Sequence, residues 1–156
     1  MATTIWNDIY NDYLAGGKAW ATIGAQLHPG FLALVENSTF ARKNALDIGC
    51  GTGSYLRHLR EKGFAVTGLD SSETAIKMTR ELLHDQGLFT VADMYEYDYP
   101  ADTYDLIISH CTAPRQEAAG DCAPHANKLG AAAGRKHLHL TPKQRGQKTL
   151  DHDERT

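Results

Sequence analysis

The stretch that decides the fold is ALDIGCGTGSYL, residues 45–56. It begins as an apolar run with one carboxylate, Asp47, and continues with glycines at positions 49, 51 and 53. A strand that runs into a glycine-rich turn and then into a helix is typical of nucleotide-binding sites, because glycine lets backbone N–H groups approach a ligand closely. The sequence on either side of this turn must show which fold and which ligand it serves.

Strand-like and helical patterns alternate around this turn. Short apolar runs predict strands at residues 44–49, 64–70, 88–93 and 104–109. Residues 54–63 and 71–87, which lie between them, have the period of helices. Strands that are apolar on both faces and alternate with helices are typical of parallel sheets covered on both sides. We therefore predict an α/β fold with a parallel sheet.

The glycine spacing and Asp47 separate two classes of ligand. Dinucleotide sites use G-x-G-x-x-G and place a diphosphate on the helix N-terminus. The spacing here is G-x-G-x-G, and Ser54 stands where the third dinucleotide glycine would fall. A carboxylate two residues before Gly49 would repel a diphosphate and attract a cationic ligand. An NAD-binding dehydrogenase domain stays an alternative, against which Asp47 argues.

S-adenosylmethionine carries such a cationic group, an ammonium and a sulfonium. The segment ALDIGCGTG resembles the first motif of the class I S-adenosylmethionine-dependent methyltransferases, in particular those that act on small molecules, and the resemblance extends over residues 40–111. It implies a Rossmann-like, doubly wound parallel sheet of the methyltransferase type, incomplete after the fourth strand. It also implies S-adenosyl-L-methionine as the cofactor and an unidentified small molecule as the methyl acceptor.

The ends of the predicted strands match the cofactor site of this family. Asp70 closes the second strand, where a carboxylate can accept hydrogen bonds from both ribose hydroxyls. Asp93 and Met94 follow the third strand, where the family holds adenine. The resemblance thus implies a cofactor site made of Asp47, Gly49, Cys50, Gly51, Gly53, Asp70, Ser71, Asp93 and Met94. Taken singly, these residues also fit turns and helix caps, and the thiol of Cys50 has no matched base and is interpreted as structural.

His110 is the candidate catalytic base. It directly follows the fourth strand, near the position at which the family places the transferred methyl group, and the ordinary pKa of histidine suits proton removal. Methyl transfer needs alignment and exclusion of water more than a dedicated base, so a loop histidine without a catalytic role is the alternative. The sequence SHCT at residues 109–112 lacks the D/N-P-P-Y type signature of families that methylate nucleobases or glutamine amides, which favours a small acceptor.

The N-terminal part is helical in character, with apolar residues at helical spacing in residues 3–17, 18–28 and 29–37. Trp6, Tyr10 and Tyr13 resemble the aromatic lead-in that folds over the cofactor as a lid in small-molecule methyltransferases. An amphipathic helix packed on the sheet explains these residues equally well.

The sequence changes character near residue 112. All 13 aromatic residues precede it, whereas residues 113–156 contain 8 Lys and Arg, 5 Asp and Glu, and only four leucines as large apolar residues. Such a segment cannot bury enough apolar surface to fold. We therefore expect an N-terminal helical lid or cap at 1–38, a cofactor-binding core at 39–112, and a non-globular tail at 113–156. The tail is either a natural extension or the product of a truncated or shifted reading frame, and an inactive cofactor-binding remnant is the matching functional alternative.

Composition disfavours several other classes of protein. The chain has no apolar run of transmembrane length and no secretory signal, so a cytoplasmic protein without a membrane partner is expected. Three cysteines form no disulfide framework, and no metal is expected, because the spacing of Cys111, Cys122, His125, His137 and His139 fits no standard zinc finger. The net charge is −3 and the basic tail lacks aromatic residues, so nucleic acid is not an expected partner. The sequence carries no sign of the oligomeric state.

Overall fold

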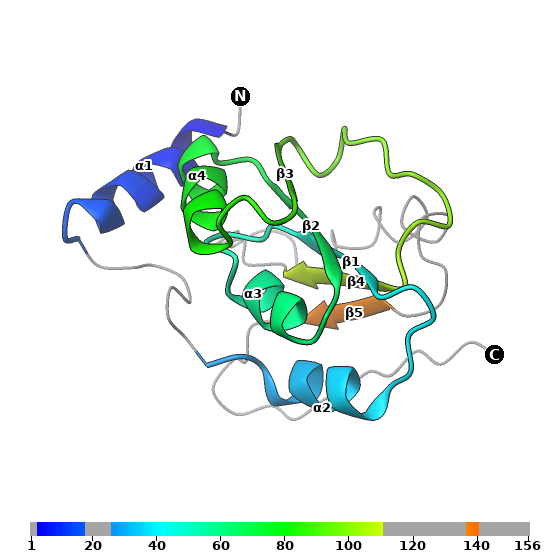
Figure 1. Ribbon diagram of the computed structural model, residues 1–156. Helices are drawn as coiled ribbons and strands as arrows, with labels where there is room; N and C mark the ends of the chain where they lie inside the picture. Colours follow the sequence, from blue (N-terminus) through cyan, green and yellow to red (C-terminus); the bar gives the residue numbers. More distant parts are fainter. Residues whose placement is uncertain (1–2, 18–25, 111–136, 141–156) are drawn as a thin grey trace.

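The computed structural model describes residues 3–17, 26–110 and 137–140, which form a sheet with helices packed against it (Figure 1). The helices are α1 (Thr3–Leu14), α2 (Pro29–Asn37), α3 (Ser54–Glu61) and α4 (Glu73–Leu82). The strands are β1 (Asn44–Ile48), β2 (Ala65–Asp70), β3 (Leu88–Val91), β4 (Leu106–His110) and β5 (His137–Leu140). None of the helices in the described residues is long and apolar enough to span a lipid bilayer. Most of the predicted helix at 18–28 lies outside the described residues, and residues 26–28 are not helical.

The five strands form one parallel sheet in the order β3-β2-β1-β4-β5. Asp47 in β1 is level with Gly68 of β2 on one side and with Ile108 of β4 on the other. The chain proceeds outward from β1 through β2 to β3 and then crosses back to β4 on the other side of β1. In such doubly wound sheets the ligand crevice lies where the strand order reverses, at the carboxyl ends of the strands. The predicted Rossmann-like sheet is confirmed, and β1 and β4 flank its reversal point.

Side chains along each strand alternate between the two faces of the sheet. One face carries Ala45, Val66 and Leu106, which belong to a buried apolar cluster shared with α2, α3 and α4. The other face carries Leu46 and Leu69, which belong to a second buried cluster. Both faces are therefore covered, which explains why the strands are apolar throughout.

The second face is covered by the connection from β3 to β4, residues 92–105, which contains no helix. Tyr99 and Tyr104 of this connection are buried and belong to the same cluster as Leu46 and Ile107. The hydroxyl of Tyr99 donates a hydrogen bond to the Met94 carbonyl at 2.8 Å. The sequence predicts no helix between the strands at 88–93 and 104–109, which is correct, but it does not predict the burial of Tyr99, whose ring is buried while its hydroxyl has a partner.

β5 lies within the range that the sequence assigns to a non-globular tail. Its residues pair in parallel with Ile107–His110 of β4. The alternation in HLHL is too short a period-two pattern to predict a strand by itself. The sheet therefore has one strand more than the sequence predicts. Residues 111–136 and 141–156 lie outside the described residues, and for them the tail assignment stays a prediction.

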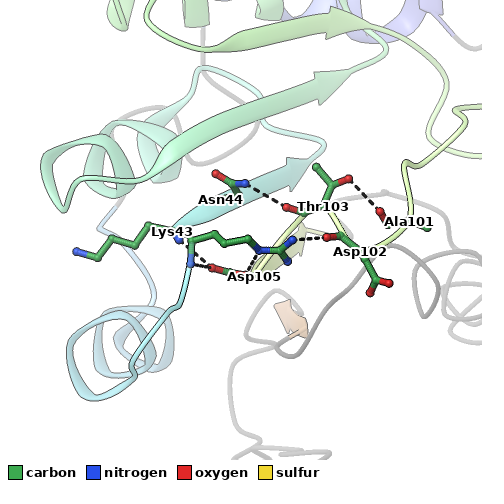
Figure 2. A network of polar contacts seen from close by, with 7 residues as sticks. Lys43, Asn44, Ala101, Asp102, Thr103 and Asp105 are labelled. Atoms are coloured by element: carbon green, nitrogen blue, oxygen red, sulfur yellow. Dashed lines mark hydrogen bonds and ion pairs between the residues drawn. The ribbon is translucent and has the colours of Figure 1, made fainter.

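A polar network joins the amino ends of β1 and β4, at the edge of the sheet opposite the crevice (Figure 2). The Asp105 carboxylate accepts hydrogen bonds from the backbone N–H groups of Arg42 and Lys43, at 2.6 and 2.8 Å, and from Nε of Arg42 at 3.1 Å. Burial alone would raise the pKa of Asp105, but the hydrogen bonds from Arg42 and Lys43 outweigh it and hold this pKa below its usual value. Asp105 therefore fastens the start of β4 to the segment that leads into β1.

We expect Asp105→Asn to lower the free energy of unfolding by about 1–3 kcal/mol, because a charged acceptor of three hydrogen bonds becomes neutral. The pKa of Asp105 is lower in the folded than in the unfolded chain. The wild type therefore has this stability above the unfolded pKa of about 3.9 and loses it as the pH falls through the folded pKa. Urea unfolding measures the effect, and the difference between the two proteins should shrink in acid.

Asp85→Asn is the matched control, since Asp85 and its partner Arg80 are both exposed and 3.6 Å apart. It should change the free energy of unfolding by less than about 0.5 kcal/mol. An equal loss in the Asp85 and Asp105 variants would contradict the fastening role of Asp105.

Candidate functional site

The glycine turn follows β1 directly, and the N–H groups of Gly49, Cys50, Gly51 and Gly53 are bonded within the protein. Gly49 and Cys50 both donate to the carbonyl of Leu69 in β2, at 2.7 and 3.0 Å, and Gly53 donates to the carbonyl of Cys50 at 3.0 Å. Gly53 has a φ of 83°, and a Cβ at this position would lie 2.9 Å from Cγ2 of Thr79 in α4. Glycine is thus required at position 53 both for the backbone conformation and for the close packing on α4.

Asp70 connects the end of β2 to the glycine turn and to α4. Its carboxylate accepts hydrogen bonds from the N–H groups of Gly51 and Ser72, each at 2.9 Å. The hydroxyl of Thr79 donates to the Gly51 carbonyl at 2.8 Å, so both polar groups of the Gly51 backbone are bonded. Burial raises the pKa of Asp70, although hydrogen bonds from Ser72, Gly51 and Ser71 oppose it. The structure therefore brings Gly51, Asp70 and Ser71 of the predicted site together.

Asp47 is buried close to the glycine turn. Its side chain is 1% exposed, and its Oδ1 has no hydrogen-bond partner among the described residues. Burial raises the pKa of Asp47 well above its usual value, and the nearby Asp70 carboxylate raises it further. An unpartnered buried carboxyl oxygen is costly, and a cation bound beside it would stabilise the charged form. The pair Asp47 and Asp70 therefore suits a positively charged ligand.

The Cys50 side chain lies in the apolar cluster between the sheet and the helices. Burial raises the pKa of its thiol well above the usual value, with further contributions from Asp47 and Asp70. A thiol that stays protonated is neither a nucleophile nor a metal ligand. The geometry fits the interpretation of the thiol as structural, and only the Cys50 backbone belongs to the turn.

Asp93 and Met94 follow β3, at the same edge of the sheet as Asp70. The N–H group of Ala92 donates to the Asp70 carbonyl at 2.9 Å, which ties this segment to the end of β2. Oδ1 of Asp93 accepts a hydrogen bond from the N–H group of Tyr95 at 2.8 Å, so this carboxylate organises its own turn. Met94 is partly buried against the second apolar cluster.

His110 is the last residue of β4. β4 runs parallel to β1 with Ser109 level with Ile48, so the His110 backbone lies at the level of the glycine turn. The structure describes the backbone of His110 and not its side chain. Among the side chains that it does describe, no group of three His, Cys, Asp or Glu residues could hold a metal ion. The possible zinc ligands from Cys111 onward lie outside these described side chains.

Helix α1 lies against α4 (Figure 1), and its Tyr10 reaches the glycine turn. The Tyr10 side chain is buried, and its hydroxyl is 2.8 Å from the position that a Cβ would take at Gly51. Burial raises the pKa of Tyr10, and Asp70, Cys50 and Asp47 raise it further. Tyr10 is therefore a neutral phenol placed beside the two acidic groups.

Three further residues at this edge of the sheet lie outside the predicted site: Asn7, Asn11 and Thr79. Asn7 and Asn11 precede and follow Tyr10 on one face of α1, and both contact α4. Their helical spacing around Tyr10 predicts that they share a face of α1, but it does not show which element that face contacts. Thr79, which holds the Gly51 carbonyl, has no comparable sign, since a threonine within a helix usually faces solvent or the core.

The sequence profile of the family described as "Methyltransferase domain" matches residues 45–130. The match includes the glycine turn, Asp70, Asp93 and His110. It continues past residue 112, at which the predicted core ends.

Related sequences of known proteins belong to methyltransferases. Ajmaline N-methyltransferase of Rauvolfia serpentina is 28% identical over 133 residues, which is 72% of this chain and 46% of that protein. The 2-heptyl-1-hydroxyquinolin-4(1H)-one methyltransferase of Mycobacteroides abscessus is 33% identical over 90 residues, 55% of this chain and 38% of that protein. The match thus spans less than half the length of these relatives.

Solved structures share the fold. A structure from work on the conversion of a disulfide bond into a thioacetal group during echinomycin biosynthesis has a TM-score of 0.68 and 25% identity, and the match covers 90% of this chain and 59% of that one. Magnesium protoporphyrin IX methyltransferase from Synechocystis PCC 6803, with bound SAM, has a TM-score of 0.63 and 19% identity, covering 88% of this chain and 74% of that one. The second similarity concerns the fold alone.

We expect Gly51→Ala to lower the melting temperature more than Gly16→Ala. Both glycines have positive φ, 55° and 92°, so alanine strains the backbone by about 1 kcal/mol at either position. A Cβ at Gly16 meets nothing within 4 Å, whereas a Cβ at Gly51 collides with the hydroxyl of Tyr10. Thermal unfolding followed by circular dichroism measures the difference.

The variant Tyr10→Phe removes the hydroxyl and should recover part of the loss when it is combined with Gly51→Ala. Equal losses in the two single glycine variants, with no recovery, would show that Tyr10 does not lie on the turn.

Proposed function

Since the chain belongs to the methyltransferase domain family, we propose that it is a class I S-adenosylmethionine-dependent methyltransferase that acts on a small-molecule acceptor. The observation that carries this proposal is the pair of acidic groups at the glycine turn. Asp47 is buried with an oxygen that has no hydrogen-bond partner among the described residues, and Asp70 lies beside it at the end of the next strand.

The polar groups of the site match those of S-adenosylmethionine. Asp47 would hold the cationic end of the cofactor, because a buried carboxyl group gains its charged form beside a positive charge. Asp70 would accept the ribose hydroxyls, since each of its oxygens has a further lone pair beyond the bond from the backbone. Asp93 would accept the adenine amino group, and Met94 would contact the ring. When bound, the cofactor supplies an activated methyl group.

The glycine turn fits a dinucleotide less well. Diphosphates bind to free backbone N–H groups at such turns. In this chain the N–H groups of Gly49, Cys50, Gly51 and Gly53 are bonded to the protein itself. The buried carboxyl group of Asp47 adds repulsion for a negative ligand.

The acceptor side of the site involves β4 and α1. The relatives with the named substrates ajmaline and a heptyl hydroxyquinolone methylate small molecules, which supports an acceptor of that size. His110, at the end of β4, would remove a proton from the acceptor. Tyr10 and α1 would close the site against water, which favours methyl transfer over side reactions.

Titration with S-adenosylhomocysteine tests the cofactor assignment. We expect Asp70→Asn to weaken binding by about tenfold or more, because the variant loses a charged acceptor for the ribose and loosens Gly51. Asp85→Asn, which changes an exposed carboxylate in the same way, should bind like the wild type. Melting temperatures of both variants show whether they are folded.

Equal affinity of the wild type and Asp70→Asn would overturn the cofactor assignment, and binding of NAD in place of S-adenosylhomocysteine would support the dinucleotide alternative. Tight binding without transfer to any acceptor would support the inactive remnant.

Binding of S-adenosylmethionine should also release protons from Asp47. The pKa of Asp47 is raised in the ligand-free protein, so part of this group is protonated above its ordinary pKa of about 3.9, and a bound cation favours the carboxylate. Affinity should therefore rise with pH between the ordinary and the raised pKa. Calorimetry in buffers of different ionisation enthalpy measures the protons released. Asp47→Asn should abolish the buffer dependence, and a wild type without any buffer dependence would contradict this role of Asp47.

A further inference from the structure

Two asparagines of α1 bind the first turn of α4. The hydroxyl of Ser72 donates a hydrogen bond to Oδ1 of Asn7 at 2.7 Å, and the N–H group of Thr74 donates to the same oxygen at 3.3 Å. The hydroxyl of Thr74 donates to Oδ1 of Asn11 at 2.9 Å. These contacts join segments that are 63 to 67 positions apart in the sequence. They fix the position of α1 at the carboxyl edge of the sheet.

The contacts of Asn7 continue into the candidate site. Ser72 donates its N–H group to Asp70, and Asp70 accepts the N–H group of Gly51. Tyr10, one helical turn after Asn7, returns from α1 to the same Gly51. Asn7, Ser72, Asp70, Gly51 and Tyr10 therefore form a closed ring of contacts between α1 and the glycine turn.

Apolar packing alone holds α1 weakly. Ile5 and Leu14 are 69% and 60% exposed. Among the described side chains of α1, Tyr10 alone is fully buried, and Trp6, Ile9 and Tyr13 are partly buried. The hydrogen bonds of Asn7 and Asn11 therefore add to the apolar packing that holds this helix in place.

We propose that Asn7 and Asn11 are positioning residues, which clamp α1 to α4 and keep Tyr10 over the bound cofactor, so that the clamp sets the rate at which the adenosyl ligand leaves. The inference rests on the proposed function and deepens it. A helix that covers a crevice must separate from its neighbours before a ligand can leave, and a weaker clamp makes that opening more frequent. Loss of the clamp therefore accelerates dissociation without slowing association, whereas a general loss of folding would reduce the binding-competent protein and slow association.

Stopped-flow fluorescence of the full chain, with S-adenosylhomocysteine as the probe, measures both rates. Asn7→Ala should increase the dissociation rate by about two- to tenfold, the effect of one hydrogen bond, and Asn11→Ala should act in the same direction. Asp8→Ala changes an exposed residue of the same helix whose side chain has no hydrogen bond in the described part of the chain, and it should leave both rates unchanged. Asn7→Asp keeps an acceptor for Ser72 and Thr74 and should restore slow dissociation.

Dissociation rates that stay unchanged in both alanine variants would overturn the proposal, and the effect of Asp70→Asn would then still support the proposed function. Absence of binding in the wild type would instead remove the proposed function. In that case, amide hydrogen exchange of the ligand-free protein tests whether Asn7 and Asn11 hold α1 against α4. The amides of α1 must exchange faster in Asn7→Ala than in Asp8→Ala, and equal exchange would overturn the clamp.

Discussion

The structure depends on the burial of two carboxyl groups at one edge of a parallel sheet. The register of β1 and β2 sets Asp47 level with Gly68, so Asp70 follows only two residues further along the neighbouring strand. The protein compensates Asp70 with backbone N–H donors but leaves an oxygen of Asp47 without a partner among the described residues. Burial favours the neutral form of the Asp47 carboxyl group, and a cation bound beside it would favour the charged form. The glycine turn, the cap of α4 and the position of α1 are all arranged around this pair.

The two edges of the sheet are used differently. At the amino edge, the Asp105 carboxylate accepts three hydrogen bonds from Arg42 and Lys43, and these bonds stabilise the folded chain. At the carboxyl edge, Asp70 accepts backbone hydrogen bonds within the ring from Asn7 to Gly51, whereas Oδ1 of Asp47 has no hydrogen-bond partner among the described residues. The hydrogen bonds of Asp105 stabilise the fold at the amino edge. The fold can therefore tolerate the cost of burying the Asp47 carboxyl group at the carboxyl edge.

The sequence predicts the parts of this structure that local patterns encode. The alternation of strands and helices in residues 44–110, the helix within 71–87 and the glycine turn follow from periodicity and spacing within a few residues. Other features depend on partners far along the chain. The burial of Tyr99 and Tyr104, the pairing of β5 and the contacts of Asn7 with α4 arise only when distant segments meet. Local periodicity cannot reveal such contacts, because the same residues would serve equally well in a solvated loop or on an exposed helix face.

The internal bonding of the glycine turn has a consequence for competing ligands. A turn whose N–H groups at Gly49, Cys50, Gly51 and Gly53 are already occupied has fewer donors to offer to ATP and other nucleoside phosphates. The backbone of the turn therefore selects against phosphate groups by itself, in addition to the charge of the nearby carboxyl groups.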